Sequence, residues 1–291
     1  MKKTKKILHF FLLIYIHALS SASLNLVVYS KNRAHQVHRF LESFILNTTG
    51  CRKISVIYKA DTKEHEKGYA IVRHDFPQVN FIKQSKSSDF KKLTINAIDF
   101  DGEDYIVFAV DDIIVTRKID FDEIVKLLET FQSTGFYLRL GEHINECYSE
   151  NRVTGTPPLK EITSGILCWK FKDGKGDWNY PHSLDMTVYK KSDLFKVFYM
   201  LPFTNPNMLE GNWAAIAPKY ETGLCYKNAP IVNCPLNRVQ NTWNNRHSNE
   251  CTPEELLEVF LTGYKMDIMP LQNIFNKAPH MDYKPTFIKR Y

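Results

Sequence analysis

The sequence predicts an α/β protein with a single mixed, mostly parallel sheet flanked by helices. Short apolar segments alternate with segments of helical periodicity through the first half of the chain, as they do in βαβ units. One of these segments, residues 105–110, is apolar at every position, which is typical of a strand buried on both faces of a parallel sheet. The 291 residues are 44% apolar and 24% charged, a balance that suits a globular domain and excludes disorder.

Apolar periodicity orders the elements of the first half. Between residues 33 and 46, apolar side chains recur every three or four positions, which is the spacing of one helix face. Short apolar runs of strand length stand before and after this segment. The expected strands are 24–29, 54–58, 79–82 and 105–110, and the expected helices are 33–46, 63–74, 89–98 and 121–131.

The pattern is less regular in the second half. Asn207 and Thr252 are expected to cap two helices, because their side chains accept hydrogen bonds from the N–H groups that a helix start leaves free. No repeat divides the chain, so we expect one domain over residues 24–291. The expected elements are a strand at 136–140, an antiparallel ribbon of 162–171 and 186–189 around a glycine-rich turn, and helices at 208–217 and from Thr252 onward.

Residues 1–23 have the pattern of a signal peptide or membrane-targeting segment. Four lysines precede an apolar stretch over residues 7–19, and small residues follow it. At about 13 residues the stretch is short for a membrane span, although an uncleaved anchor is the alternative. We therefore expect an exported or membrane-associated protein, with a cytoplasmic face as the other possibility. The formal charge of +6 lies partly in this segment, so no nucleic-acid partner is expected.

Two carboxylates, Asp111 and Asp112, directly follow the apolar strand at 105–110. A buried carboxylate without a partner is strongly unfavourable. Open parallel sheets bind ligands at the carboxyl ends of their strands, and adjacent carboxylates there suit a divalent cation. The sequence therefore predicts a metal-dependent active site that holds Mn²⁺ or Mg²⁺, with Asp112 as the principal ligand. The alternative is that both acids are turn or cap residues.

Several segments resemble nucleotide-sugar glycosyltransferases with the A-type fold. The strand end and helix at the start of the chain resemble the opening of that family, and the Asp111-Asp112 strand resembles its aspartate-rich metal motif. Many members have an acid where Val110 stands here, so the metal would depend chiefly on Asp112. The segments that carry the resemblance are 28–33, 40–43, 105–115, 186–191 and 209–213.

The resemblance implies a metal-dependent glycosyltransferase. It would move a sugar from a nucleoside-diphosphate sugar, most simply a UDP-sugar, to a glycan or other hydroxyl acceptor, with inversion. Residues 24–135 would bind the nucleotide sugar, and residues 136–291 would shape the acceptor site. The alternatives are a non-catalytic protein of the same fold that binds a sugar nucleotide or glycan, and a nucleotidyltransferase. The absence of a glycine-rich phosphate loop near the first strand counts against the last of these.

Four side chains are candidates for binding the donor. Arg33 follows the first strand and suits the nucleotide or its phosphates. Asp61 is placed to bond a pyrimidine base, as the resemblance implies, with a helix N-cap as its alternative role. Lys91 is a candidate for a phosphate contact, and its alternative is a solvated helix face. Asp111 would bond the ribose hydroxyls or a metal-bound water.

An inverting transfer needs a base that takes the proton of the acceptor hydroxyl. Glu210 is the first candidate, because it is expected near a helix start beside Gly211, where an acceptor can approach closely. Its alternative role is that of a first-turn acid favoured by the helix dipole. Asp185, which precedes an apolar strand, is the second candidate base.

Aromatic rings and a polar loop complete the expected site. A sugar ring can stack on a flat aromatic face, and a polar loop over residues 235–247 is expected to close over the diphosphate. The alternatives are core aromatics and a surface loop. The aromatic candidates are Trp178, Tyr180 and Trp213, and those of the loop are Arg238, Arg246 and His247.

Overall fold

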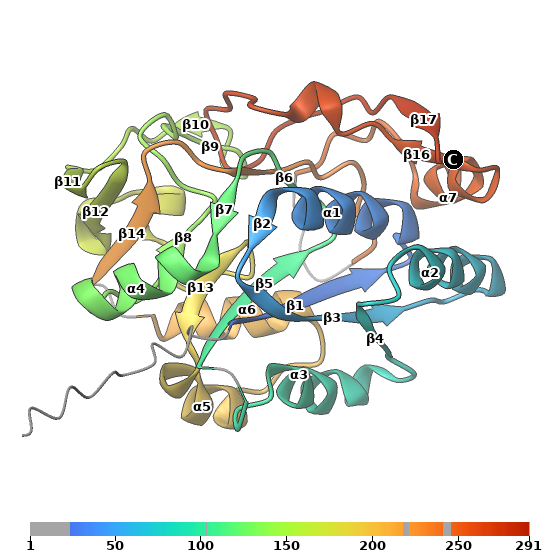
Figure 1. The fold of residues 1–291 in the computed structure, drawn as a ribbon, viewed down its shortest axis with the longest axis horizontal. Helices are drawn as coiled ribbons and strands as arrows, with labels where there is room; N and C mark the ends of the chain where they lie inside the picture. Colours follow the sequence, from blue (N-terminus) through green and yellow to red (C-terminus); the bar gives the residue numbers. More distant parts are fainter. Residues whose placement is uncertain (1–23, 103, 218–220, 241–245, 291) are drawn as a thin grey trace, which may run out of the picture.

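The computed structural model describes residues 24–102, 104–217, 221–240 and 246–290. Its centre is a nine-stranded sheet in the order β11-β12-β14-β8-β13-β5-β1-β3-β4 (Figure 1). Strands β4, β3, β1 and β5 are mutually parallel, as the alternation of strands and helices predicted. The strands of this parallel half are β1 (Leu24–Lys31), β3 (Cys51–Lys59), β4 (Asn80–Lys83) and β5 (Tyr105–Val110).

The other half of the sheet is mixed. β13 is antiparallel to both β5 and β8, and β12 is antiparallel to β11 and β14, whereas β14 runs parallel to β8. The predicted fold class is therefore confirmed. The strands of this half are β8 (Phe136–Tyr137), β11 (Lys160–Thr163), β12 (Ile166–Lys170), β13 (Thr187–Lys190) and β14 (Thr222–Tyr226).

Short strands pair outside the main sheet. β2 joins β7, β6 joins β15, β9 joins β10, and β16 joins β17. Their bounds are β2 (Thr48–Thr49), β6 (Ile113–Val115), β7 (Ile119–Asp120), β9 (Glu146–Cys147), β10 (Arg152–Val153), β15 (Ile231–Asn233), β16 (Tyr264–Met266) and β17 (Phe287–Lys289).

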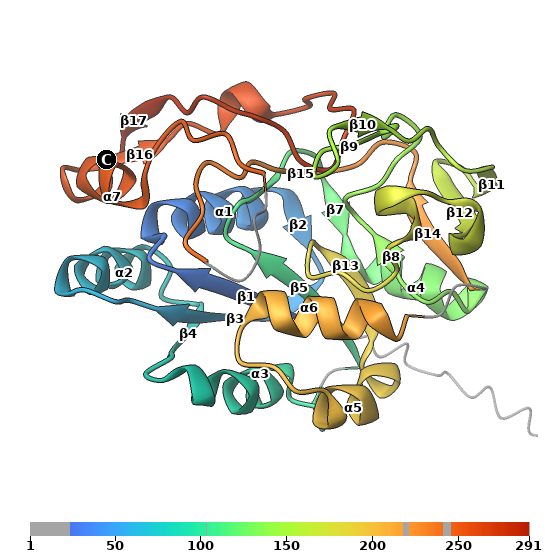
Figure 2. The same cartoon turned by 180° about the vertical axis from the view of Figure 1, so that it is seen from behind.

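Helices cover both faces of the sheet (Figures 1 and 2). Helices α1, α2, α4 and α7 contribute to one buried core, and α3, α5 and α6 to the other. Their bounds are α1 (Ala34–Asn47), α2 (Lys63–Asp75), α3 (Phe90–Ile98), α4 (Phe121–Phe131), α5 (Lys191–Met200), α6 (Pro206–Ala215) and α7 (Pro253–Leu261). Short 3₁₀ helices lie at Ser87–Asp89, Phe171–Asp173, Gly176–Asn179 and Met269–Leu271.

The strands at the centre are apolar because both of their faces are covered. Successive side chains of a strand point to opposite faces. In β5, Val107 and Ala109 pack in the core that contains α1, whereas Ile106 and Phe108 pack in the core that contains α6. This arrangement explains why residues 105–110 carry no polar residue at all.

The antiparallel ribbon that was expected in the second half is not formed. Segments 162–171 and 186–189 do not form a ribbon, because β13 lies between β5 and β8 while β12 pairs with β11 and β14. All of Thr187, Val188 and Tyr189 are buried, as befits a central strand. Between the two strands the glycine-rich segment forms 3₁₀ turns.

The helix at Glu210 begins earlier than expected. Its N-cap is Asn205, whose Oδ1 accepts a hydrogen bond from the Met208 N–H at 2.9 Å, and not Asn207. Proline favours the first position of a helix because it has no N–H to leave unsatisfied. Pro206 therefore fixes the start of α6, and the residue before it becomes the cap.

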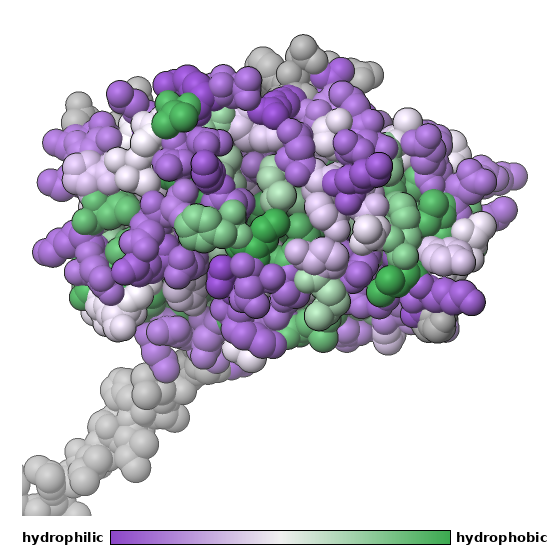
Figure 3. All heavy atoms as spheres, turned by 90° about the horizontal axis from the view of Figure 1, so that it is seen from above, coloured by the Kyte–Doolittle hydropathy of each residue, from purple (hydrophilic) through white to green (hydrophobic). Residues whose placement is uncertain are grey.

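After α7 and β16, the last part of the chain runs above α1 toward β9 and β10 and then returns to β17, which pairs with β16 (Figure 1). Seen from that side, the surface is mostly hydrophilic, with apolar side chains in small groups (Figure 3). Among the described residues, the structure contains no helix with the length and apolar character needed to cross a bilayer. The predicted signal or targeting segment, residues 1–23, lies outside the described residues.

Candidate functional site

A cavity of about 730 Å³ opens at the carboxyl ends of the parallel strands. Ser30 and Lys31 from β1, Lys59 from β3 and Val110 from β5 line one side of it. This is the end of an open parallel sheet at which ligands bind. The volume lies within the usual range of small-molecule sites, which is roughly 300–1,000 Å³.

Asp111 and Asp112 stand at this end of β5 and share one guanidinium. Arg33 Nη1 donates to Asp111 Oδ1 at 3.0 Å and to Asp112 Oδ2 at 2.7 Å. Ser30 Oγ donates to the other oxygen of Asp111 at 2.8 Å, and the Tyr69 hydroxyl contacts the same Oγ at 2.7 Å. The ends of β1 and β5 are adjacent in register, which brings these groups together. Three residues that the sequence proposed separately therefore form one cluster.

The guanidinium of Arg33 is held from its other side by the C-terminal part of the chain. Its Nε donates to Asn237 Oδ1 at 2.8 Å, and its Nη2 donates to the Asn237 carbonyl. The Asn237 amide in turn donates to the Cys251 carbonyl at 3.0 Å. Arg33 is thus fixed between β5 and a segment about 200 residues further along the chain, with its cationic end turned toward the acids.

The charges of this cluster depend on one another. Burial alone would lower the pKa of Arg33, but the charges of Asp112 and Asp111 outweigh it and raise that pKa. Burial raises the pKa of Asp111 to about 6, an effect that the Arg33 charge opposes and the Asp112 charge strengthens. Arg33 is therefore always charged here, and Asp111 carries its full charge only above mildly acidic pH.

The acid pair has donors suited to a divalent cation. Asp112 Oδ1 is buried and has no hydrogen-bond partner among the described residues. No third histidine, cysteine or acid joins the pair to form a cation cluster within the described part of the chain. Magnesium-type sites commonly use one or two carboxylates and take their other ligands from water and substrate phosphates. The residues present fit a cation of that kind.

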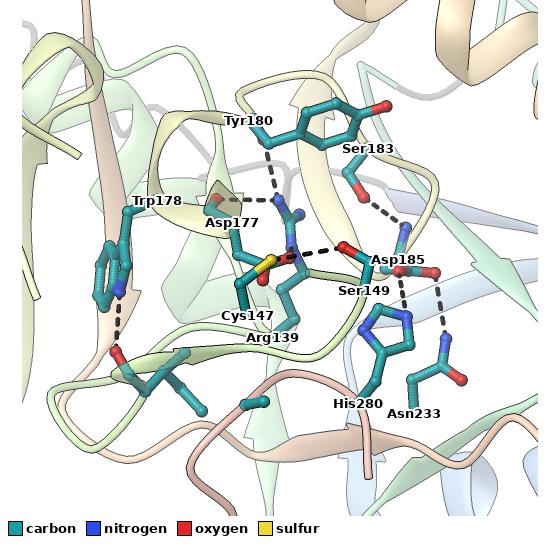
Figure 4. Close-up of polar contacts among 12 residues, drawn as sticks. Arg139, Cys147, Ser149, Asp177, Trp178, Tyr180, Ser183, Asp185, Asn233 and His280 are labelled. Carbon is teal, nitrogen blue, oxygen red and sulfur yellow. Dashed lines mark hydrogen bonds and ion pairs between the residues drawn. The ribbon is translucent and has the colours of Figure 1, made fainter. Parts of the chain in front are cut away.

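A second pair of acids, Asp185 and Glu210, lines the same cavity. Glu210 Oε1 accepts a hydrogen bond from the Leu184 N–H at 2.8 Å, so α6 is tied to the segment before β13. Asp185 is held by three groups (Figure 4). Its N–H donates to Ser183 Oγ at 3.0 Å, and Asn233 Nδ2 donates to its Oδ1 at 3.4 Å. The third group is the His280 imidazole, 3.4 Å from Oδ2.

The pKa values of these two acids move in opposite directions. Burial raises the pKa of Glu210 to about 7, and the charge of Asp185 adds to this shift. Burial also acts to raise the pKa of Asp185, but the hydrogen bond and charge of His280, with Arg139 and Asn233, lower it instead. Environments that separate the pKa values of two neighbouring acids indicate different chemical roles. The lowered pKa favours the anionic form of Asp185, whereas the raised pKa of Glu210 lies near neutral pH.

Arg139 forms a further wall of the cavity, and nothing in the sequence singled it out. Its side chain is only 2% exposed and lies over the Tyr137 ring. Nη2 donates to the Tyr180 carbonyl at 2.9 Å, and Nε is 3.9 Å from Asp177 Oδ1 (Figure 4). Nη1 donates to Thr187 Oγ1 at 3.2 Å. Arg139 therefore presents a fixed positive charge near the second acid pair.

Other candidates lie elsewhere. Asp61 does not line the cavity. Its carboxylate forms ion pairs with two lysines that do line it, Lys31 at 3.2 Å and Lys59 at 3.3 Å. It does not cap α2 either, because Thr62 does so. The ammonium of Lys91 donates to two carbonyls at the end of α5 and lies outside the cavity lining.

Only part of the expected aromatic and loop candidates reaches the cavity. Trp213 is almost completely buried in the core that contains α6, and Trp178 is equally buried in a separate apolar cluster with Tyr137 and Trp169, so neither offers a face to a sugar. Tyr180 lines the cavity. Of the polar loop, residues 241–245 lie outside the described residues. Its cavity-lining candidates are Arg238, Arg246 and His247.

Asn237, Asn233, Arg139 and His280 belong to the site and were missed as candidates in the sequence. Each comes from a segment without a recognisable motif. The short polar segment around Asn237 was proposed as a site loop, but on account of its arginines. His280 stands between Pro279 and Met281 in a tail that carried no chemical pattern. Contacts over such sequence separations have no local signal.

The chain resembles a known glycosyltransferase. No protein-family model matches it. It is 27% identical over 262 residues to the bifunctional glycosyltransferase pgtA of Dictyostelium discoideum, which covers 76% of this chain. The chain spans about a third of the length of that relative, 33%. The resemblance to glycosyltransferases inferred from the sequence is thereby confirmed.

The chain is also weakly similar in structure to two solved proteins. TarS from S. aureus in complex with UDP matches with a TM-score of 0.45 and 10% identity, over 70% of this chain and 60% of that one. The mannosyltransferase PcManGT from Pyrobaculum calidifontis, in complex with GDP-Man and Mn²⁺, matches with a TM-score of 0.36 and 11% identity, over 60% and 46%.

Proposed function

We propose that the chain is a metal-dependent glycosyltransferase that moves a sugar from a nucleoside-diphosphate sugar, a UDP-sugar in the first instance, to a hydroxyl group of a glycan or other acceptor, with inversion. One observation carries this proposal. A single cavity is lined by the acid pair Asp111-Asp112 with a fixed guanidinium and by another acid, Glu210, whose pKa is raised to about 7. The acid pair, which marks the donor end of the cavity, suits a diphosphate with its cation, and Glu210 suits a hydroxyl that must lose a proton.

The donor end combines opposite charges that a diphosphate complex needs. Asp112 and Asp111 would hold Mn²⁺ or Mg²⁺, and the bound cation would neutralise charge on the leaving diphosphate. Arg33 supplies a fixed positive charge beside them, in a planar form that pairs well with phosphate oxygens. Lys31 and Lys59, held by Asp61, add cations at the rim of the same end.

Glu210 is the base that we propose for the acceptor. A base works best when its pKa lies near the working pH, because it is then deprotonated and still basic enough to take a proton. The pKa of Glu210, about 7, meets this condition. Asp185, the second candidate, has a lowered pKa and is committed to His280 and Asn233, which makes it the weaker base.

The proposal also includes the remaining expectations from the sequence. Donor contacts by Lys91 and by the Asp61 carboxylate itself rest on the sequence alone. The same holds for export or membrane association, which depends on residues 1–23.

The proposal is tested by incubating the purified chain with a panel of nucleotide sugars and Mn²⁺ and by measuring release of the nucleoside diphosphate. We expect release that a chelator abolishes and that Asp112→Asn slows by about 100-fold or more, since a buried charge at the reacting phosphates is lost. Asp99→Asn is the matched control, because Asp99 forms an ion pair with Lys53 at the end of α3 outside the cavity lining. Binding of a sugar nucleotide without turnover would instead favour the non-catalytic binding protein.

A further inference from the structure

The C-terminal segment around His280 is built into the wall of the cavity. It runs parallel to β15: the Asn233 N–H donates to the Pro279 carbonyl, and the Met281 N–H donates to the Asn233 carbonyl, both at 2.9 Å. These two bonds fix the main chain on either side of residue 280. The imidazole therefore projects from a rigid position toward the segment before β13 (Figure 4).

The imidazole itself is held between two partners. Its Nε2 is 3.4 Å from Asp185 Oδ2. The ring stacks on Tyr148, with centroids 5.8 Å apart and planes at 22°. Tyr148 is fixed in turn, because its hydroxyl donates to Asp282 at 2.5 Å and the Arg246 guanidinium lies 4.1 Å from its ring centre.

We propose that His280 is a positioning residue of the transfer reaction, which holds Asp185 as a fixed anion beside Glu210 so that Glu210 takes the proton of the acceptor. This inference rests on the proposed function and adds a residue to it. Both oxygens of Asp185 are engaged, one by His280 and one by Asn233. With Asp185 held in this way, the carboxyl group that remains to exchange a proton is that of Glu210.

The charges around the three groups support this division. Two anions, Asp185 and Asp177, and one cation, Arg139, act on His280. Burial would lower the pKa of His280, but the hydrogen bond and charge of Asp185 outweigh burial and raise it. Glu210 faces Asp185 and Arg139. Removing the His280 cation would leave the two acids with less positive charge nearby. The deprotonation of the acid pair would then require higher pH.

Two substitutions separate the roles of His280. His280→Gln keeps an amide donor near the position of Nε2 but removes the charge, whereas His280→Phe keeps a flat ring on Tyr148 and removes both donor and charge. We expect kcat of His280→Phe to fall by about tenfold or more, since a displaced catalytic group loses rate steeply, with donor KM within about twofold. His280→Gln should recover part of that kcat, with its acidic pH limb shifted to higher pH by roughly half a unit or more.

A second measurement does not depend on activity. The NMR signal of the His280 ring, identified by its loss in His280→Phe, should titrate above the ordinary value of 6.5 in the wild-type chain and below it in Asp185→Asn. A titration unaffected by Asp185→Asn would overturn the inference. So would unchanged kcat and an unchanged pH profile in His280→Phe, in a chain whose wild type is active. A wild-type chain without transfer from any donor would overturn the proposed function, and this inference with it.

Discussion

At the scale of single residues, the central feature is a buried cluster of one cation and two anions. Arg33 faces Asp111 and Asp112, so the cluster keeps a net negative charge whenever both carboxyl groups are ionised. The Asp112 Oδ1 atom is buried and finds no hydrogen-bond partner in the part of the chain that the structure describes. Such a cluster is stable enough to fold and still attracts a further cation, which suits a site that must bind a metal and a diphosphate together.

Removal of Arg33 should destabilise the protein because two buried acids would lose their counter-charge. We expect Arg33→Gln to lower the free energy of unfolding by about 3–5 kcal/mol. Arg152→Gln is the control: Arg152 pairs with Glu150 in an exposed ion pair, for which about 1 kcal/mol or less is expected. Urea denaturation followed by circular dichroism measures both. Equal effects of the two substitutions would contradict the claim that Asp111 and Asp112 need the charge of Arg33.

Glu210 predicts a pH dependence of stability. Its pKa is raised from 4.5 in the unfolded chain to about 7 in the folded one, so the folded state binds more protons between these values. Stability contributed by Glu210 is therefore present below about pH 4.5 and is lost as the pH rises toward 7. Urea denaturation at several pH values should show a shallower decline over this window for Glu210→Gln than for the wild type. The exposed Glu250→Gln should leave the decline as it is, and parallel curves for Glu210→Gln would contradict the assignment.

At the scale of elements, the sequence predicted the strands and helices whose apolar period and capping residues lie within a few positions of one another. The first-half strands and helices were found because period and capping are read within a few residues. β13 was placed in a ribbon because the sequence of so short a strand does not show which strands it pairs with. α5 was missed, although Leu194, Val197, Phe198 and Leu201 have helical spacing and pack in one core. That core lies against β5, which no local pattern indicates.

The start of α6 gives a test at this scale. Asn205→Ala should lower the free energy of unfolding by about 0.5–2 kcal/mol, because the Met208 N–H loses its acceptor. Asn207→Ala replaces the same residue type two positions later, inside the helix, and should change stability by no more than about 0.5 kcal/mol. Thermal or chemical denaturation distinguishes them. A larger effect at Asn207 would mean that the cap was correctly predicted from the sequence and that the helix starts later.

At the scale of the whole molecule, the two cores pack the helices on the faces of the sheet that carries the cavity at its strand ends. Phe108 on β5 is fully buried, stacks on Phe198 of α5 with centroids 5.6 Å apart, and contacts Trp213 of α6. Phe108→Ala should therefore cost about 3–5 kcal/mol of unfolding free energy. Leu46→Ala, at a side chain that is 57% exposed, is the control and should change it by about 0.5 kcal/mol or less. A small effect at Phe108 would mean that α5 and α6 are not firmly packed on the sheet.

The candidate site was predictable from the sequence only in part. Asp111, Asp112 and Arg33 follow strands whose ends the topology of a parallel sheet brings together, so their meeting could be expected. Asn237 meets Arg33, and His280 meets Asp185, only because late segments of the chain return to the cavity, which is a consequence of the complete fold. Sequence reasoning found the end of the cavity made by regular elements and missed the walls made by irregular ones.

The central claim is that a diphosphate binds where Asp111, Asp112 and Arg33 meet. A crystal structure of the chain soaked with Mn²⁺ and a nucleoside-diphosphate sugar tests it most directly. The account predicts the metal on Asp112, the diphosphate between the metal and Arg33, and the sugar directed toward Glu210. A donor bound elsewhere, or an Asp112 carboxylate turned away from both metal and phosphate, would contradict it.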